Sequence, residues 1–105
     1  MAKKSVIKII NRYLELLRKN GLKIDKAYLF GSFARGDENH ESDIDLMIVS
    51  KIFDSENDKA VGLAWKITRQ VDSRIEPYLV GLEKFNNDDI SPLLQIVKQE
   101  GISLV

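Results

Sequence analysis

The chain has 105 residues, enough for one small hydrophobic core, and we expect residues 1–105 to form a single domain. It has no cysteine, which excludes disulfides and thiolate metal sites and suits a reducing cytoplasm. The formal net charge is zero, so we do not expect nucleic acid as the main partner, and no apolar run is long enough to span a membrane.

The charges are unevenly distributed along the chain. Residues 1–26 contain eight lysines and arginines against two acidic residues, whereas residues 27–60 contain three against eight. A basic flank beside an acidic centre would steer a phosphate toward a metal site. The simpler alternative is a solvated, charged helix face.

An amphipathic helix is predicted over residues 5–20. Its apolar residues recur at intervals of three and four, so we expect one face to pack against a sheet; they are Val6, Ile10, Tyr13, Leu14 and Leu17. Residues 26–30 are predicted to form a strand. Residues 32–35 are predicted to begin a short helix with Ser32 at or near its N-cap.

A second strand is predicted over residues 44–49, where Ile-Asp-Leu-Met-Ile-Val is apolar on both faces beyond its aspartate. Such a strand is typical of the centre of a sheet that is covered on both sides. Residues 59–71 are predicted to form a long helix with an apolar face of Val61, Ala64, Trp65, Thr68 and Val71. We expect Trp65 to lie in the core rather than to act as a stacking platform.

A third strand is predicted over residues 74–80. Its alternation places Glu76 and Tyr78 on one face, and Pro77, which has no N–H to donate, favours an edge position. Ser91 and Pro92 are typical of the N-cap and first residue of a helix, which Gly101 would end. The apolar face of that helix would contain Leu93, Leu94, Ile96 and Val97.

The chemistry of the chain is concentrated between residues 31 and 45. An apolar strand ends in Gly31 and Ser32, a turn whose backbone N–H groups can bind a phosphate. Asp43 and Asp45 are two residues apart, so they share a face of the second strand. Two neighbouring carboxylates repel each other unless a cation lies between them, and Mg²⁺ is commonly held by one or two carboxylates and substrate phosphates. The pattern therefore favours a site for a metal–nucleoside triphosphate.

Two other phosphate- or metal-binding motifs are excluded. A calcium loop starting at Asp43 would need an oxygen ligand at Met47 and a glycine at Ile48. A P-loop would need Gly-Lys followed by serine or threonine after Gly31, and the chain has none there.

The combined motif resembles that of the minimal nucleotidyltransferases, which belong to the DNA polymerase β-like nucleotidyltransferase superfamily. It consists of Gly31-Ser32 followed by Phe-Ala-Arg-Gly, and then of Ser-Asp43-Ile-Asp45-Leu after a spacing of ten residues from Ser32. The resemblance covers essentially the whole chain. It implies a nucleotidyltransferase fold of the α/β (α+β) class, a small mixed sheet flanked by helices.

The resemblance also implies roles for the carboxylates. Asp43 and Asp45 would be catalytic metal ligands for one or two Mg²⁺ ions. Glu76 matches the position of a third carboxylate, as metal ligand or general base, although the superfamily often has aspartate there. Asp72 is the competing candidate, at the end of the preceding helix.

On the nucleotide side, the resemblance implies that Gly31 and Ser32 bind the β- and γ-phosphates of ATP. For Arg35 two interpretations stay open, a contact with the triphosphate and a surface ion pair.

The acceptor is inferred from the resemblance alone. Minimal nucleotidyltransferases of this kind resemble the antitoxin half of HEPN–nucleotidyltransferase toxin–antitoxin pairs. The implied activity is transfer of AMP from ATP to a tyrosine hydroxyl of a HEPN toxin. The missing acceptor surface would come from that partner or from a second copy, so a homo-oligomer stays open. The alternative is an antitoxin that neutralises its partner by contact alone, with a vestigial nucleotide site.

Overall fold

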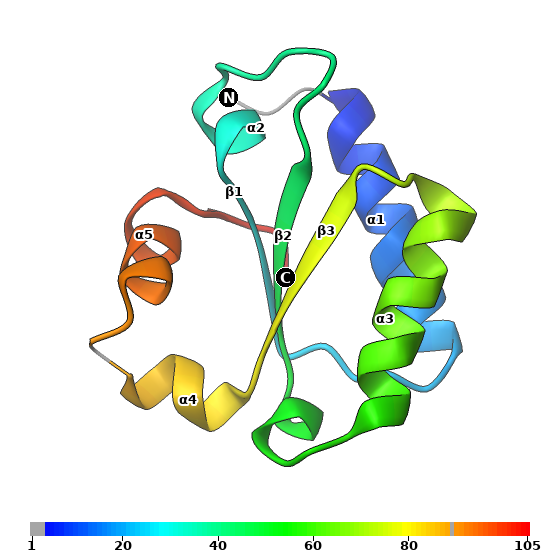
Figure 1. Cartoon of the computed structure of the whole chain (residues 1–105), viewed down its shortest axis with the longest axis vertical. Helices are drawn as coiled ribbons and strands as arrows, with labels where there is room; N and C mark the ends of the chain where they lie inside the picture. The colour runs from blue at the N-terminus through cyan, green and yellow to red at the C-terminus, as the bar shows by residue number, and fades with distance from the viewer. Residues whose placement is uncertain (1–3, 89) are drawn as a thin grey trace.

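The computed structural model describes residues 4–88 and 90–105. Its helices are α1 (Lys4–Lys19), α2 (Ser32–Arg35), α3 (Asp58–Val71), α4 (Leu82–Asn87) and α5 (Pro92–Glu100), with a 3₁₀ turn η1 (Lys51–Asp54). Its strands are β1 (Lys26–Phe30), β2 (Ile44–Val49), β3 (Ile75–Val80) and β4 (Ile102–Ser103). Within the described residues these strands form one sheet in the order β3-β2-β1-β4 (Figure 1).

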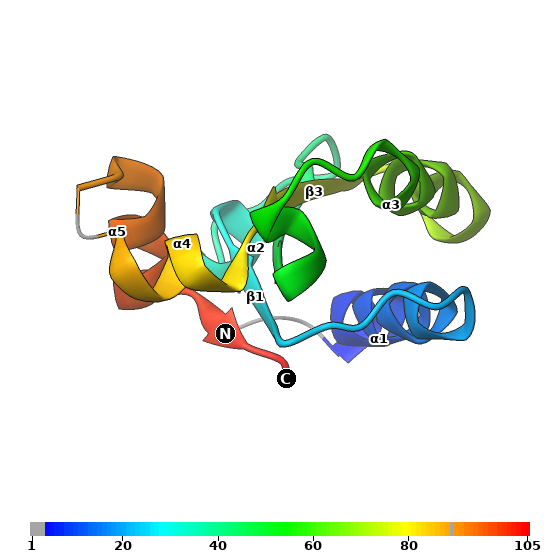
Figure 2. The same ribbon diagram turned by 90° about the horizontal axis from the view of Figure 1, so that it is seen from below.

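The sheet is mixed and has helices on both faces. β1 is antiparallel to β2 and β4, whereas β2 and β3 are parallel and are joined through α3. Figures 1 and 2 show α1 and α3 on one side of the sheet and α4 and α5 on the other. The expected α/β (α+β) fold with a small mixed sheet flanked by helices is therefore confirmed.

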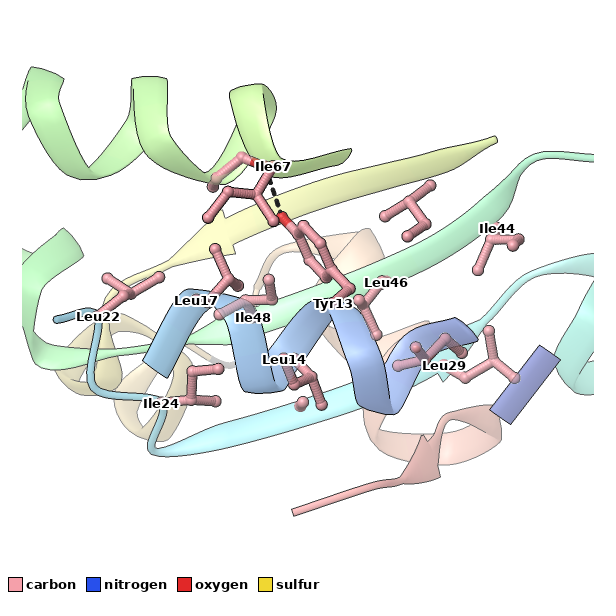
Figure 3. Packing of buried hydrophobic residues seen from close by; sticks show 14 of the residues in the cluster. Tyr13, Leu14, Leu17, Leu22, Ile24, Leu29, Ile44, Leu46, Ile48 and Ile67 are labelled. Carbon is pink, nitrogen blue, oxygen red and sulfur yellow. Dashed lines mark hydrogen bonds between the residues drawn. The ribbon is translucent and has the colours of Figure 1, made fainter. Parts of the chain in front are cut away.

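The larger core lies between the sheet and the helices α1 and α3 (Figure 3). The predicted apolar face of α1 is confirmed, because all five of its residues are buried. The hydroxyl of Tyr13 on that face donates a hydrogen bond of 2.7 Å to the carbonyl oxygen of Ala64 in α3. This bond satisfies the one polar atom of the side chain and fixes the two helices relative to each other.

β2 occupies the position that its sequence predicts. It lies between β1 and β3, and its side chains alternate between the two cores. Leu46 and Ile48 face α1 and α3, whereas Met47 and Val49 pack with residues of α4 and α5. β3 is an edge strand, as Pro77 predicts. The parallel pairing of β2 with β3 places their first residues side by side at one end of the sheet.

The prediction that Trp65 lies in the core is wrong. The buried residues of α3 are Ala60, Ala64, Ile67 and Thr68, whereas 47% of Trp65 and 39% of Val61 are exposed. The two alanines let α1 approach α3 closely, and the bond from Tyr13 needs the carbonyl of Ala64 to face α1. α3 is therefore rotated about its axis so that the indole of Trp65 points toward solvent.

α5 shows a smaller difference of the same kind. Leu94 and Val97 are buried as predicted, but Leu93 and Ile96 are 36% and 44% exposed. The predicted cap is confirmed, since the hydroxyl of Ser91 accepts a bond from the N–H of Leu94 and Pro92 is the first helical residue. Among the described residues no helix has the length and apolar character needed to cross a membrane.

The orientation of α3 predicts opposite outcomes for two neighbouring substitutions. Ile67→Ala removes a side chain that is 1% exposed and should lower the free energy of unfolding by about 2–5 kcal/mol. Trp65→Ala should cost about 1 kcal/mol or less, because half of that side chain already contacts water. Urea unfolding followed by circular dichroism measures both. An equal loss in the two variants would contradict the orientation.

Candidate active site

Three carboxylates lie together at the end of the sheet where β2 and β3 begin. Asp43 directly precedes β2, Asp45 is its second residue, and Glu76 is the second residue of β3. Asp45 and Glu76 are partners in the parallel register, so their side chains leave the sheet on the same face. This is the face that carries α4 and α5 further along the strands. The predicted shared face of Asp43 and Asp45 is extended by Glu76.

Of the three carboxylates, that of Asp45 is the most buried. Its partial burial, followed by the negative charge of Asp43, raises its pKa above the ordinary value. The hydroxyl of Tyr78, 3.5 Å from Oδ1, and the positive charge of Arg35 act in the opposite direction. The carboxylate is thus held among like charges that are not fully compensated.

Glu76 is electrostatically coupled to both aspartates. Partial burial raises its pKa, and the charges of Asp43 and Asp45 raise it further. An interaction with the Asp43 side chain raises the pKa as well, and one with the Tyr78 hydroxyl lowers it. A carboxyl that holds its proton more tightly than usual is suited to accept one during a reaction.

Tyr78 is a site residue that sequence reasoning did not single out. Its ring packs edge-on against Phe30 with the centroids 5.0 Å apart, and its hydroxyl reaches Asp45. Partial burial and the charges of the neighbouring carboxylates raise its pKa. The signal was present, since the alternation that places Glu76 on this face also places Tyr78 there.

Gly31 lies directly against the side chain of Asp45 in the candidate site. Its φ of 77° and ψ of −153° lie in a region that is essentially restricted to glycine. A Cβ atom at this position would collide with Oδ2 of Asp45 and lie 3.1 Å from its Cγ. Glycine is therefore required both by the backbone and by the close approach of the aspartate.

Gly31, and not Ser32, is the N-cap of α2. The prediction placed Ser32 at or near this position, and the structure makes it the first helical residue, without a side-chain cap. Phe33 anchors the short helix with 3% exposure, and Gly36 ends it in a left-handed conformation at φ 81°. α2 lies at the same end of the sheet as the carboxylates (Figure 1).

Arg35 and Asp72 have different surroundings. The Nε of Arg35 is 3.2 Å from Oδ2 of Asp37, an exposed ion pair of the kind that contributes little and is easily exchanged. Asp72 instead forms a close pair with Arg74 at 2.9 Å, and these hydrogen bonds lower its pKa. Its carboxylate is committed to closing the turn before β3, which leaves Glu76 as the carboxylate that joins the aspartates.

A metal ion fits this donor set only in part. The carboxylates are hard oxygen donors on one face, and their mutual repulsion favours a cation. Among the described residues, however, no group of three aspartate, glutamate, histidine or cysteine side chains converges closely enough to hold an ion. The arrangement fits Mg²⁺ held by two carboxylates together with triphosphate oxygens and water, rather than by protein ligands alone.

The sheet and its carboxylate end define a class of protein, the nucleotidyltransferases. The chain belongs to the family described as "Polymerase beta, Nucleotidyltransferase", which it matches over residues 10–104. This confirms the resemblance first seen in Gly31-Ser32 and Asp43-Ile-Asp45.

Individual relatives also point to a nucleotidyltransferase. The chain is 33% identical over 76 residues to the "Putative protein adenylyltransferase MJ0141" of Methanocaldococcus jannaschii, covering 70% of this chain and 75% of that protein. A toxin–antitoxin structure with AMP-PNP is 33% identical, with a TM-score of 0.62 over 90% of this chain and 71% of that one. A nucleotidyltransferase structure from Sulfolobus solfataricus has a TM-score of 0.63 at 17% identity, over 92% and 77%, and supports the fold alone.

The contact between Gly31 and Asp45 can be tested against a second glycine. Gly21 also has a positive φ, 91°, but a Cβ there would meet no atom within 4 Å. Gly21→Ala should therefore cost only the backbone term of about 1–2 kcal/mol. Gly31→Ala should cost more and should displace Asp45, which urea unfolding and the carboxyl ¹³C resonance of Asp45 would report. Equal costs with an unmoved resonance would refute the contact.

The charge coupling predicts the effect of Asp43→Asn in metal-free buffer. The substitution should lower the pKa of Asp45 and of Glu76, because the charge of Asp43 raises both. A raised pKa means that the folded protein binds these protons more tightly, so the two groups cost stability as the pH rises through their folded pKa values. Asp43→Asn should therefore raise the free energy of unfolding more at pH 7 than at pH 4.

Asp72→Asn is the control of opposite sign. Its hydrogen bonds with Arg74 lower the pKa of Asp72, so it stabilises the fold above its unfolded pKa and loses this effect as the pH falls. Asp72→Asn should therefore lower stability at pH 7 and change it little at low pH. Carboxyl NMR titration and urea unfolding at both pH values measure these effects. Unchanged titration of Asp45 and Glu76 in Asp43→Asn would disprove the coupling.

Proposed function

We propose that residues 1–105 act as one minimal nucleotidyltransferase domain that moves AMP from ATP to a hydroxyl group of a protein partner. The observation that carries the proposal is the parallel register of Asp45 and Glu76, which gathers three carboxylates on one face beside Gly31. The reaction forms a bond between the acceptor oxygen and the α-phosphorus of ATP. The bond from the α-phosphorus to the oxygen that bridges it to the β-phosphorus breaks, and pyrophosphate leaves.

In this proposal the chain's residues have separate tasks. Asp43 and Asp45 hold Mg²⁺, which when bound supplies positive charge to the triphosphate. Gly31 and Ser32 bind the β- and γ-phosphates through backbone N–H groups, and Gly31, which has no side chain, lets Asp45 lie against this turn. Arg35 exchanges its exposed partner Asp37 for a phosphate oxygen.

Glu76 serves as the proton acceptor or the third metal ligand. As acceptor it takes the proton of the attacking hydroxyl, a role for which its raised pKa is suited. Tyr78 keeps the carboxylate of Asp45 in place through its hydroxyl. Catalysis then consists mostly of positioning and of charge stabilisation.

The partner we propose is a HEPN toxin, modified on a tyrosine, so that the chain acts as an antitoxin. The support is of two kinds. One relative is named as a protein adenylyltransferase, and structures of toxin–antitoxin pairs, one with AMP-PNP, have the same fold at 31–33% identity. The HEPN identity and the tyrosine come from the resemblance of the Gly-Ser and Asp-x-Asp motifs.

A second candidate is an antitoxin that acts by contact alone. It is favoured by the glutamate at the position where the superfamily often has aspartate, and by the incomplete convergence of the carboxylates in the described residues. Such a protein would form a stable complex and bind nucleotide without transferring it.

Intact-mass spectrometry tests the proposal. The protein is incubated with Mg-ATP and the HEPN protein encoded beside it. We expect AMP adducts on the partner, and a loss of about a hundredfold or more in rate for Asp43→Asn and Asp45→Asn. Chelation of the metal should have the same effect.

Asp58→Asn is the matched control, because it removes an exposed aspartate at the far end of α3 and should leave the rate unchanged. Full activity in both site variants would refute the assignment. A stable complex with nucleotide bound and no adduct would favour the contact-only antitoxin.

A further inference from the structure

An open groove lies behind the active end of β3, on the other side of the strand from the carboxylates. It has a volume of about 450 Å³ and is lined by Gly62, Trp65, Lys66, Thr68 and Arg69 of α3 and by Ser73 and Ile75. Ile75 directly precedes Glu76 in the chain, and neighbouring residues of a strand point to opposite faces. The groove and the candidate active site therefore lie on opposite faces of the first residues of β3.

The tryptophan in this groove is only half buried. It is 47% exposed, and its backbone oxygen, rather than its indole, accepts a hydrogen bond of 2.6 Å from the Thr68 hydroxyl. Exposed tryptophans are uncommon on protein surfaces and are strongly enriched at the centres of protein–protein interfaces.

Neither the conformation nor the packing of α3 requires the glycine at position 62. Gly62 lies inside α3, where glycine destabilises a helix relative to alanine. Its φ is not positive, and a Cβ built on it would meet no atom within 4 Å, so neither the backbone nor the internal packing requires it. The recess that it leaves beside Trp65 is open to a molecule from outside.

The groove is also positively charged. Lys66 and Arg69 are exposed, and neither has an ion-pair partner among the described residues. Together with Gly62 and Trp65 they follow the spacing i, i+3, i+4 and i+7, which places all four on one face of α3. An apolar anchor flanked by two uncompensated cations is complementary to an acidic segment that carries an apolar side chain.

We propose that this groove docks an acidic segment of the acceptor protein and so delivers the acceptor hydroxyl to the carboxylates around the start of β3. The proposal rests on the proposed adenylyl transfer to a protein. β3 is the edge strand of the sheet, so no further strand lies between the groove on the side of Ile75 and the carboxylates on the side of Glu76. Docking in the groove and reaction at Asp43, Asp45 and Glu76 can thus involve one continuous stretch of the partner.

Nucleic acid is the other polyanion that an exposed tryptophan and two cations could bind. A nucleic-acid site of usual size neutralises roughly 6–10 phosphates, and this groove offers two free cations. The neighbouring end of the sheet carries Asp43, Asp45 and Glu76, which would repel a phosphate backbone that continued in that direction. In a protein segment the acidic residues can be confined to the groove, and the part that reaches the carboxylates can be uncharged.

Trp65 itself reports on the groove, because it is the only tryptophan of the chain. The probe is a random copolymer of glutamate and tyrosine, with a lysine–tyrosine copolymer and oligo(dT) for comparison, and the tryptophan is excited where tyrosine does not absorb. We expect the acidic copolymer to shift the emission to the blue and the basic copolymer to leave it unchanged. Lys66→Glu combined with Arg69→Glu should weaken binding of the acidic copolymer by about tenfold or more.

Two further variants separate docking from folding and from net charge. Gly62→Leu should fill the recess and abolish binding while the melting temperature stays the same or rises, since the site is open and leucine favours a helix. Lys23→Glu with Lys51→Glu reverses two exposed lysines at the opposite end of the sheet and should leave binding unchanged. Equal binding by wild type and the Lys66–Arg69 variant would overturn the proposal, and so would tighter binding of oligo(dT) than of the acidic copolymer.

The same variants distinguish a failure of this proposal from a failure of the proposed function. Asp43→Asn with Asp45→Asn should abolish AMP transfer to the tyrosines of the copolymer but keep the fluorescence shift. Lys66→Glu with Arg69→Glu should still bind Mg-ATP but transfer AMP to the copolymer at least tenfold more slowly at low copolymer concentration. Transfer unaffected by the groove variants would reject the docking role and leave the transferase standing.

Discussion

The parallel pairing of β2 with β3 is the constraint on which the candidate site depends. It sets Asp45 beside Glu76, although the whole of α3 separates them in sequence. Partial burial raises the pKa of Asp45 and Glu76, and repulsion from the neighbouring carboxylates raises it further. The energy stored in that repulsion is what a bound cation would recover.

The parts of the structure that depend on local sequence patterns were predictable. The apolar periodicity of α1, the two-sided apolar run of β2 and the edge proline of β3 each describe an element whose surroundings follow from its own residues. The same holds for the Gly31 turn, because a small residue between a strand and a helix indicates a close approach. The approaching atom, Oδ2 of Asp45, belongs to the next strand and could only be identified from the register.

The parts that depend on contacts between distant elements were not predictable. Hydrophobicity alone placed Trp65 inside, whereas the rotation of α3 is set by the small residues Ala60 and Ala64 and by the hydroxyl of Tyr13. Likewise, only the pairing with Arg74 removes Asp72 from the set of site carboxylates, and only the position of the hydroxyl beside Asp45 adds Tyr78. For Trp65 and Tyr78 the deciding atom lies on another element, whereas Arg74 lies only two residues from Asp72 and the pairing depends on the conformation of the turn.

The two edges of the sheet have a consequence for how any partner can attach. One edge is β3, where Pro77 interrupts the row of backbone donors, and the other is the short β4, which is followed by a further bond from the N–H of Leu104 to the carbonyl of Ala27. Neither edge offers the long, regular ladder that an incoming strand needs for β-augmentation. Recognition of this protein should therefore proceed through side chains on its helices and loops, which makes its specificity adjustable by surface substitutions that leave the sheet intact.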